Sequence, residues 1–469
     1  MSIKIKPGLR VHFIGIGGKG LNGIAKICLQ KGCVVTGSDT SEKEEVSALA
    51  RLGVKIYKNQ ETSNIDRNID VVVRTSLVPT TCPEIVRAFE LKIPVLKRSE
   101  FLKILMKPYR KIAISGSHGK STTTALFGLG LMGAGKDPTI VCGAHIKELG
   151  AYERLGKGRD IVVEACEFDR SFFDLVSDVG VVTSIEKSHL EYYKDEEEMV
   201  GAFEKFVGMF AKKAVIFMNG DMKFADRIAK KAACKIVRFG ELDTNDYIVK
   251  NIDLKPGATS FSILKKGGSS RKDKVLLNLT INLPGAYNAL NFAALVAYFD
   301  HFGLPPGPIK KLAKNFRGIK RRFDIKTRGN NFVVLDDFSH HPTQLRNVVE
   351  SLKQFWPDHK LVTVFQPRQY HILKALLKEH GEAFHLADEV ILTDIAPALG
   401  DTEADKRDFS LDDVIKSINT HSPKSKVLYL GDYVKITNYI RKYRDTKAVV
   451  ATIGAGDVYK IADNVVLNV

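Results

Sequence analysis

The sequence predicts an α/β protein of three domains, each built on a mainly parallel, doubly wound sheet. The chain has 469 residues, and domains hold roughly 150 residues each, so about three are expected. Three segments also begin with an apolar strand and a glycine turn, after which strands alternate with helices, as in parallel sheets. We place the domains at residues 1–107, 108–316 and 317–469.

The first and third segments read as Rossmann-like domains. In the first, the apolar run VHFIGIG predicts a buried strand, and a helix is expected over residues 21–31. Further strands of this domain are expected at residues 33–37, 70–76 and 93–97. In the third segment, strands are expected at residues 332–337, 360–367, 389–394, 426–431 and 448–456.

The second segment reads as a P-loop-type domain. It opens on the strand KIAIS, which runs into a glycine turn and a helix. Apolar strands follow at residues 160–165 and 179–185, and a more β-rich stretch occupies residues 247–284. A helix after Asn288 is expected to close this domain.

Charge is the one unusual feature of the composition, because the formal net charge is +17. Nucleic-acid binding would explain a basic surface, but the lysines are scattered through every segment. The chain lacks RNP aromatics, zinc-finger spacing and a basic arm. We therefore expect no nucleic-acid partner and interpret the charge as a surface bias that also attracts anionic substrates.

The six cysteines form no CxxC pair, so free thiols in a reducing cytosol are expected. The first residues lack the apolar core and cleavage site of a signal peptide. No apolar run approaches the roughly 18 residues that span a bilayer. We therefore expect a cytoplasmic protein with no membrane contact, present as a monomer or weak homodimer.

The strongest motif is a glycine loop between a strand and a helix. Backbone N–H groups at such a helix start bind phosphates. Lys120 can reach the terminal phosphates and the Ser121 hydroxyl can bind Mg²⁺. The loop is shorter than the Walker consensus, and a chance match is the alternative. The expected ATP-binding loop comprises Gly116, Ser117, His118, Gly119, Lys120, Ser121 and Thr122.

A second glycine motif lies between the first strand and its helix. Gly15, Gly17 and Gly20 fit GxGxxG, and Asp39 ends the next strand, where an acid can bind a ribose. The pattern alone is weak. It is compatible with NAD, FAD or a UDP-sugar, or with a tight turn that binds nothing, and on its own it would suggest an NAD-dependent oxidoreductase.

Two single residues follow central strands, where parallel sheets bind ligands. Glu164 ends one strand and can hold Mg²⁺ together with Ser121. His189 lies just past the next and can bind a second metal or a phosphate. The alternatives are a helix-capping acid for Glu164 and a polar loop residue for His189.

A last polar cluster comprises RRFD, which begins at Arg321, and DDFSHHP, which begins at Asp336. Two acids and two histidines at a strand end are unusual for a structural turn. Adjacent histidines lack the spacing of helical zinc sites. A solvated loop is the alternative interpretation.

Taken in order, these motifs resemble one family, the Mur ligases, over nearly the whole chain. The matching stretches are GIGGKGLNGIA, GSDT, SGSHGKSTTT, EFDRSF, HLEYYKD, PGAYNALN, FRGIKRRFD, DDFSHHPT, FQP and GAGD. The resemblance implies a UDP-sugar domain, an ATP domain and an amino-acid domain, in that order. It implies a ligase of peptidoglycan synthesis that joins L-alanine to the lactyl carboxylate of UDP-N-acetylmuramate through an acyl phosphate, with ATP and Mg²⁺ as cofactors.

The resemblance also implies roles for particular residues. Ser121 and Glu164 would hold one Mg²⁺, and His189 a second. Asn288 would face the adenine, Asp337 the ATP ribose, and Arg322 the phosphates. The residues implied for catalysis are Lys120, His189, Arg322 and His340. Those implied for the UDP-sugar are Gly15, Gly17, Gly18, Gly20, Asp39, Thr75 and Ser76.

Several residues depart from the pattern of the alanine-adding family members. Near the metal and the adenine these are Cys166, Ser188 and Tyr287. In the amino-acid pocket they are Phe338, Arg368, Gln369, Ile372 and Ala396. The loss of an arginine at Ile372 would remove an ion pair to the amino acid. A ligase for the murein tripeptide L-Ala-γ-D-Glu-diaminopimelate is the main alternative, and a non-catalytic regulatory homologue is another.

Overall fold

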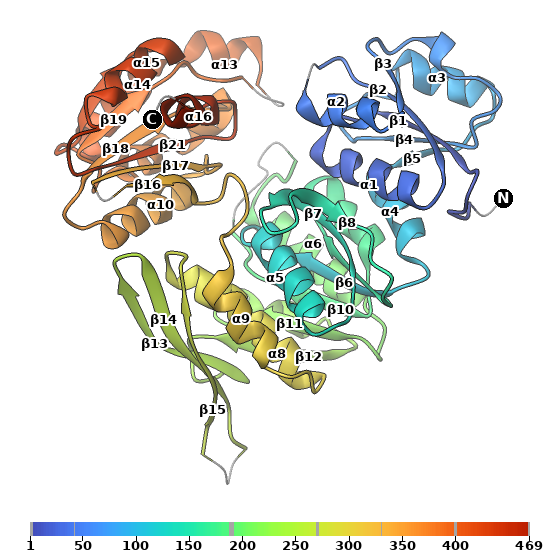
Figure 1. Cartoon of the computed structure of the whole chain (residues 1–469), viewed down its shortest axis with the longest axis horizontal. Coiled ribbons are helices and arrows are strands. Elements are labelled where there is room, and N and C mark those ends of the chain that lie inside the picture. Colours follow the sequence, from blue (N-terminus) through green and yellow to red (C-terminus); the bar gives the residue numbers. More distant parts are fainter. Residues whose placement is uncertain are drawn as a thin grey trace.

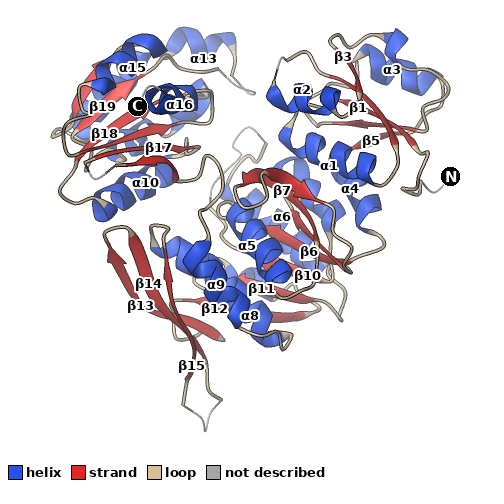
Figure 2. Cartoon of the chain, viewed as in Figure 1, coloured by secondary structure: helices blue, strands red, loops and turns tan. Residues whose placement is uncertain are grey.

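The computed structural model describes residues 3–41, 43–186, 192–268, 272–329, 331–397 and 401–467. Three α/β domains follow one another along the chain, as the sequence predicts (Figure 1). Helices cover the faces of each sheet (Figure 2). Within the described ranges, no helix combines the length and apolarity needed to cross a bilayer.

The N-terminal domain is a five-stranded parallel sheet in the order β3-β2-β1-β4-β5. Its strands are β1 (Arg10–Ile14), β2 (Val34–Ser38), β3 (Lys55–Tyr57), β4 (Val71–Arg74) and β5 (Val95–Lys97). Its helices are α1 (Lys19–Gln30), α2 (Glu44–Arg51), α3 (Pro83–Glu90) and α4 (Arg98–Met106). The sequence prediction omits β3, because this edge strand is short and has no fully buried residue.

The central domain contains a ten-stranded sheet in the order β15-β14-β13-β12-β11-β10-β6-β9-β7-β8. The strands from β7 to β13 along this order pair in parallel. They include β6 (Arg110–Ser115), β7 (Thr139–Ile146), β9 (Asp160–Glu164), β10 (Val179–Val182), β11 (Val215–Asn219) and β12 (Lys235–Gly240). At one edge, β8 (Ala151–Arg154) runs antiparallel to β7.

The β-rich stretch expected at residues 247–284 is an antiparallel ribbon that projects from the other edge of the central sheet (Figure 1). It comprises β13 (Tyr247–Lys255), β14 (Ala258–Lys265) and β15 (Lys274–Ile281). The central helices are α5 (Lys120–Gly133), α6 (Glu196–Gly208), α7 (Ala225–Ala229), α8 (Ala286–His301) and α9 (Gly307–Asn315).

The C-terminal domain has a six-stranded sheet in the order β16-β17-β21-β18-β19-β20. The five expected strands are β17 (Phe332–Asp337), β18 (Lys360–Phe365), β19 (Glu389–Leu392), β20 (Lys426–Tyr429) and β21 (Ala448–Ile453). The prediction omits β16 (Asp324–Arg328), which pairs antiparallel with β17. The helices are α10 (Pro342–Phe355), α11 (Tyr370–Ala375), α12 (Leu377–Glu382), α13 (Glu403–Asp408), α14 (Leu411–His421), α15 (Tyr433–Arg441) and α16 (Tyr459–Leu467).

An apolar core joins the first two domains. It runs from β1 and α1 through α4 to a short 3-10 segment, η2 (Phe168–Leu175), and on to α6. Phe101 of α4 and Phe172 of η2 are fully buried in it. Burying a side chain of this size contributes about 1.5–3 kcal/mol to stability, so this core fixes the N-terminal domain against the central sheet.

Candidate active site

The phosphate loop forms because β6 ends at Ser115 and α5 begins at Lys120. Gly116 and Gly119 have φ angles of 136° and 80°, a region that favours glycine. A Cβ at Gly116 would lie 2.2 Å from the hydroxyl oxygen of Thr183. The two glycines thus allow a tight turn that points N–H groups of the helix start outward, where a phosphate can bind.

Lys120 is held inside this loop by a buried acid. Its ammonium donates to both carboxylate oxygens of Glu167, at 3.1 and 2.9 Å, and to the carbonyl of Gly116. Burial is the largest single influence and acts to lower the pKa of Lys120, but the charges of Glu167, Cys166 and Glu164 and the hydrogen bond to Glu167 together outweigh it, so the pKa is raised. Lys120 is therefore a permanent cation. The sequence interpretation missed Glu167, although it follows Glu164 by three residues at the same sheet edge.

Ser121 and Glu164 meet as the motifs predict. Ile114 of β6 pairs with Glu164 of β9 across the parallel ladder, so the loop and the acid share one edge. The Ser121 hydroxyl donates to Glu164 Oε2 at 2.7 Å, and Gly143 N–H donates to the same oxygen at 2.9 Å. A hydroxyl and a carboxylate are the hard oxygen ligands that Mg²⁺ prefers, so this pair fits that ion.

The second expected metal site falls on a part of the chain that the structure leaves undescribed. His189, expected at that metal, lies outside the described residues, as does Ser188. Among the residues that the structure does describe, no three His, Cys, Asp or Glu side chains are grouped to hold a metal.

One cavity, of about 290 Å³, lies between the central and C-terminal domains. It is called the nucleotide cavity here because most of the predicted ATP-binding residues line it. These are Ser117, His118, Gly119, Lys120, Ser121, Thr122, Asn288, Arg322 and Asp337. The Asp337 carboxylate accepts the N–H groups of Phe323 and Ser339, at 2.7 and 2.8 Å, which fixes the loops around it.

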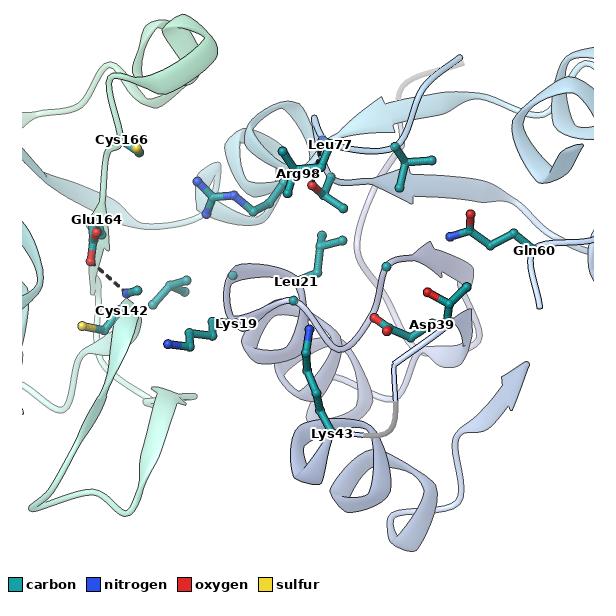
Figure 3. Close-up of a pocket in the computed structure, with 18 residues that line it drawn as sticks. Lys19, Leu21, Asp39, Lys43, Gln60, Leu77, Arg98, Cys142, Glu164 and Cys166 are labelled. Carbon is teal, nitrogen blue, oxygen red and sulfur yellow. Dashed lines mark hydrogen bonds between the residues drawn. The ribbon is translucent and has the colours of Figure 1, made fainter. Parts of the chain in front are cut away.

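A second cavity, of about 460 Å³, lies between the N-terminal and central domains (Figure 3). The predicted sugar-binding residues that line it are Gly15, Gly18, Gly20, Asp39 and Thr75. Gly17 lies beside them and donates its N–H to Asp39 Oδ2 at 2.8 Å. Glu164 lines the central-domain wall, and Lys19 lies between the two walls (Figure 3). The glycine loop after β1 and the expected metal ligand Glu164 therefore line the same cavity.

A third cavity, of about 560 Å³, is lined by residues of all three domains. Its lining residues include Lys120, Arg98, Arg322 and Arg368, and no Asp or Glu occurs among the described residues that line it. The cavity therefore attracts anions. Ser76, predicted to bind the sugar, lines this cavity with Thr75 and donates to Asp169 at 2.7 Å.

The departures from the family pattern lie mostly around this third cavity. Its lining residues include Phe338, Arg368, Gln369 and Ile372. Ala396 lies behind them and bridges to the Arg368 backbone. Lys19 of the N-terminal domain lies 5.2 Å from the centre of the Phe338 ring. The two end domains thus contact each other beside this cavity.

Three family models match consecutive parts of the chain. The Mur ligase family catalytic domain matches residues 10–110, the middle domain residues 114–299, and the glutamate ligase domain residues 321–456. The protein belongs to the Mur ligase family.

Relatives of this Mur ligase support the assignment over its full length. UDP-N-acetylmuramate–L-alanine ligases from Alkaliphilus metalliredigens and Clostridium kluyveri are 35% and 34% identical, covering 96% and 99% of both chains. The structure of the UDP-N-acetylmuramate–alanine ligase from Thermotoga maritima matches with a TM-score of 0.82 at 25% identity, covering 98% of each chain. A murein peptide ligase from Psychrobacter arcticus shares the fold, with a TM-score of 0.69 at 20% identity and 98% coverage of each.

In this Mur ligase, His118 connects the phosphate loop to the C-terminal domain. Its Nδ1 accepts from the Gln344 amide of α10 at 2.8 Å, and its Nε2 lies 3.2 Å from Glu186. The His118 hydrogen bond lowers the pKa of Glu186 and outweighs the effect of burial. The loop therefore contacts the domain that supplies Arg322.

Two of the altered residues line these cavities. Cys166 lines both the third cavity and the second, which is called the sugar cavity after the predicted sugar-binding residues in its lining. Tyr287 lines the nucleotide cavity next to Asn288, and burial followed by the charge of Asp337 raises its pKa. Tyr287 is therefore neutral and can offer a ring face to a bound base.

His340 is half-buried and neutral. Its pKa is lowered to about 4, chiefly because burial disfavours the charged imidazole; the Phe338 carbonyl acts in the opposite sense, and the charges of Arg322 and Arg368 contribute to the lowering. As pH falls below about 6.5, this imidazole takes up a proton in the unfolded chain but not in the folded protein, so the free energy of unfolding decreases.

His340→Gln should make the protein less sensitive to acid. Between pH 7 and pH 5, the free energy of unfolding should fall by about 2 kcal/mol less in this variant than in the wild type, as measured by urea unfolding. His385→Gln, at a side chain that is 40% exposed, should leave the pH dependence unchanged.

Proposed function

We propose that the protein forms the amide bond between the lactyl carboxylate of UDP-N-acetylmuramate and L-alanine, using ATP, for peptidoglycan synthesis. The observation that carries this proposal is that three cavities meet at one pair of residues. Glu164 is shared by the sugar and nucleotide cavities, and Lys120 by the nucleotide and third cavities. A reaction of three substrates needs such a junction.

The chemistry follows from the charges at that junction. A carboxylate is a poor electrophile, so phosphorylation by ATP supplies a leaving group. Phosphoryl transfer depends mainly on positioning and on neutralising charge. Lys120 and Arg322 approach the phosphates from opposite domains and supply that charge. Ser121 and Glu164 would hold Mg²⁺, which neutralises the phosphates further when bound.

The third cavity would receive L-alanine. Arg368 lies there, and the described part of the lining contains no acid, so its guanidinium can bind the amino acid's carboxylate. His340 contacts the Phe338 carbonyl through Nδ1 at 3.3 Å. If Nδ1 carries the proton, Nε2 is left as an acceptor for the amine. Closure around this cavity would exclude the water that hydrolyses an acyl phosphate.

Phosphate release by the purified protein tests the proposal. With ATP, Mg²⁺ and UDP-N-acetylmuramate present, L-alanine should stimulate release well above glycine, L-serine or the murein tripeptide. Mass spectrometry should detect UDP-N-acetylmuramoyl-L-alanine. Stimulation by the tripeptide with L-alanine inert would instead assign the protein to the recycling ligases. No sugar-dependent release with any amine would reject ligase activity.

A further inference from the structure

The segment that follows β9 connects the sugar-binding loop to the phosphate loop. Asp169 and Arg170 in η2 have φ angles of 54° and 51°, in the left-handed region that few residues other than glycine adopt. Such conformations persist where surrounding contacts hold them, and they cluster at functional sites. The contacts made by this segment are therefore informative.

Asp169 binds the N-terminal domain at two points. Its Oδ2 accepts the Ser76 hydroxyl at 2.7 Å and the Lys97 ammonium at 2.7 Å. Burial acts to raise the pKa of Asp169, but the bonds from Lys97 and Ser76 outweigh it and the pKa is lowered. Asp169 is therefore an anion clamped to the loop that follows β4.

The other end of the same segment binds the phosphate-loop lysine. Glu167 is fully buried and accepts from Lys120 through both oxygens. Its backbone carbonyl accepts the Tyr193 hydroxyl at 2.7 Å, which fixes the segment from the far side. A single residue separates the acid that binds Lys120 from the acid that binds Ser76.

Two other hydrogen bonds between described residues of these domains do not reach both loops. Asp174, also in η2, accepts the Ser99 hydroxyl of α4 at 2.8 Å. On the opposite side, Tyr152 donates to Glu45 at 3.0 Å. Neither bond involves the loop at Thr75 and Ser76, which lines the sugar cavity and the third cavity.

We propose that Asp169 is a positioning residue that fixes the Thr75–Ser76 loop relative to Lys120 and so couples UDP-sugar binding to ATP binding. The inference rests on the proposed function. A sugar nucleotide that orders the loop also orders the segment that holds Lys120. The two ligands then strengthen each other's binding, because coupling between sites is reciprocal.

Asp169→Asn is the sharpest test. Asparagine has the same shape and also tolerates the left-handed conformation, but it lacks the charge that pairs with Lys97. Calorimetry should measure the affinity for a non-hydrolysable ATP analogue with Mg²⁺, with and without saturating UDP-N-acetylmuramate. The wild-type protein should bind the analogue at least about fivefold more tightly with the sugar present. The variant should lose that gain and show a raised KM for UDP-N-acetylmuramate at nearly unchanged kcat.

Two further variants separate coupling from simple tethering. Asp174→Asn removes a bond of the same segment to α4 and should keep the wild-type coupling. Lys97→Met removes the ion pair from the other side and should give the result expected of Asp169→Asn. It keeps the proposal testable if Asp169→Asn folds poorly.

The proposal is overturned if the wild-type protein shows no coupling, if Asp169→Asn retains it, or if Asp174→Asn loses it equally. Failure of the proposed function gives a different result, namely no sugar-dependent phosphate release by the wild-type protein.

Discussion

Replacing Lys120 with methionine should reduce phosphate release by roughly a thousandfold while leaving UDP-N-acetylmuramate binding within about twofold of wild type. Removal of one preorganised charge from a transition state commonly reduces turnover about 10²–10³-fold. Lys120 is the cation at the centre of the phosphate loop, and it lines the nucleotide and third cavities but not the sugar cavity. Steady-state phosphate release and calorimetry with the sugar nucleotide measure the two effects separately.

The same change leaves Glu167 buried without its partner. An uncompensated buried charge is costly, so Lys120→Met should also lower the melting temperature unless Glu167 takes up a proton. Pairing it with Glu167→Gln removes that charge and should restore stability without restoring activity. Lys136→Met, in the exposed turn that follows the same helix, is the matched control and should match wild type in every assay. Near-normal turnover in Lys120→Met would show that the loop does not bind the transferred phosphate.

The main elements of the fold could be predicted because their signals are local. Buried parallel strands such as β1 and β17 are continuous apolar runs, and the sequence marks where each one ends. Since carboxyl ends of parallel strands share one edge, the order of strands and motifs along the chain was enough to predict that Ser121 and Glu164 meet. The strands β3 and β16 could not be predicted in the same way, because their sequences, KIY and DIKTR, are not continuous apolar runs.

Contacts between domains could not be predicted, because they depend on how the sheets are placed against each other. Ser76 and Asp169 are 93 residues apart, and His118 and Gln344 are 226 residues apart. Glu167 was visible in the sequence, but only the backbone turn after β9 directs it toward Lys120. Asp169 adopts the left-handed conformation although it is not a glycine, so this conformation could not be recognised in the sequence. The residues that line the cavities were thus more predictable than the residues that hold them in place.

Glu164→Gln should reduce turnover by at least about a hundredfold and raise the Mg²⁺ concentration needed for half-maximal activity. The amide oxygen can still accept the Gly143 N–H, which the carboxylate now accepts at 2.9 Å, so the fold should be kept. What is lost is a negative oxygen next to Ser121, and a neutral amide binds Mg²⁺ more weakly. Phosphate release measured across a range of Mg²⁺ concentrations reports both quantities.

Comparison with Lys120→Met makes this result specific. Both variants should be slow, but only Glu164→Gln should change the Mg²⁺ requirement, because Lys120 carries its charge without binding the metal. Glu197→Gln removes an exposed carboxylate that pairs with Arg227 and should leave both quantities unchanged. If Glu164→Gln showed the wild-type Mg²⁺ dependence at any turnover, the metal would lie elsewhere. The hydroxyl–carboxylate pair at 2.7 Å would then serve only to fasten β9 to the phosphate loop.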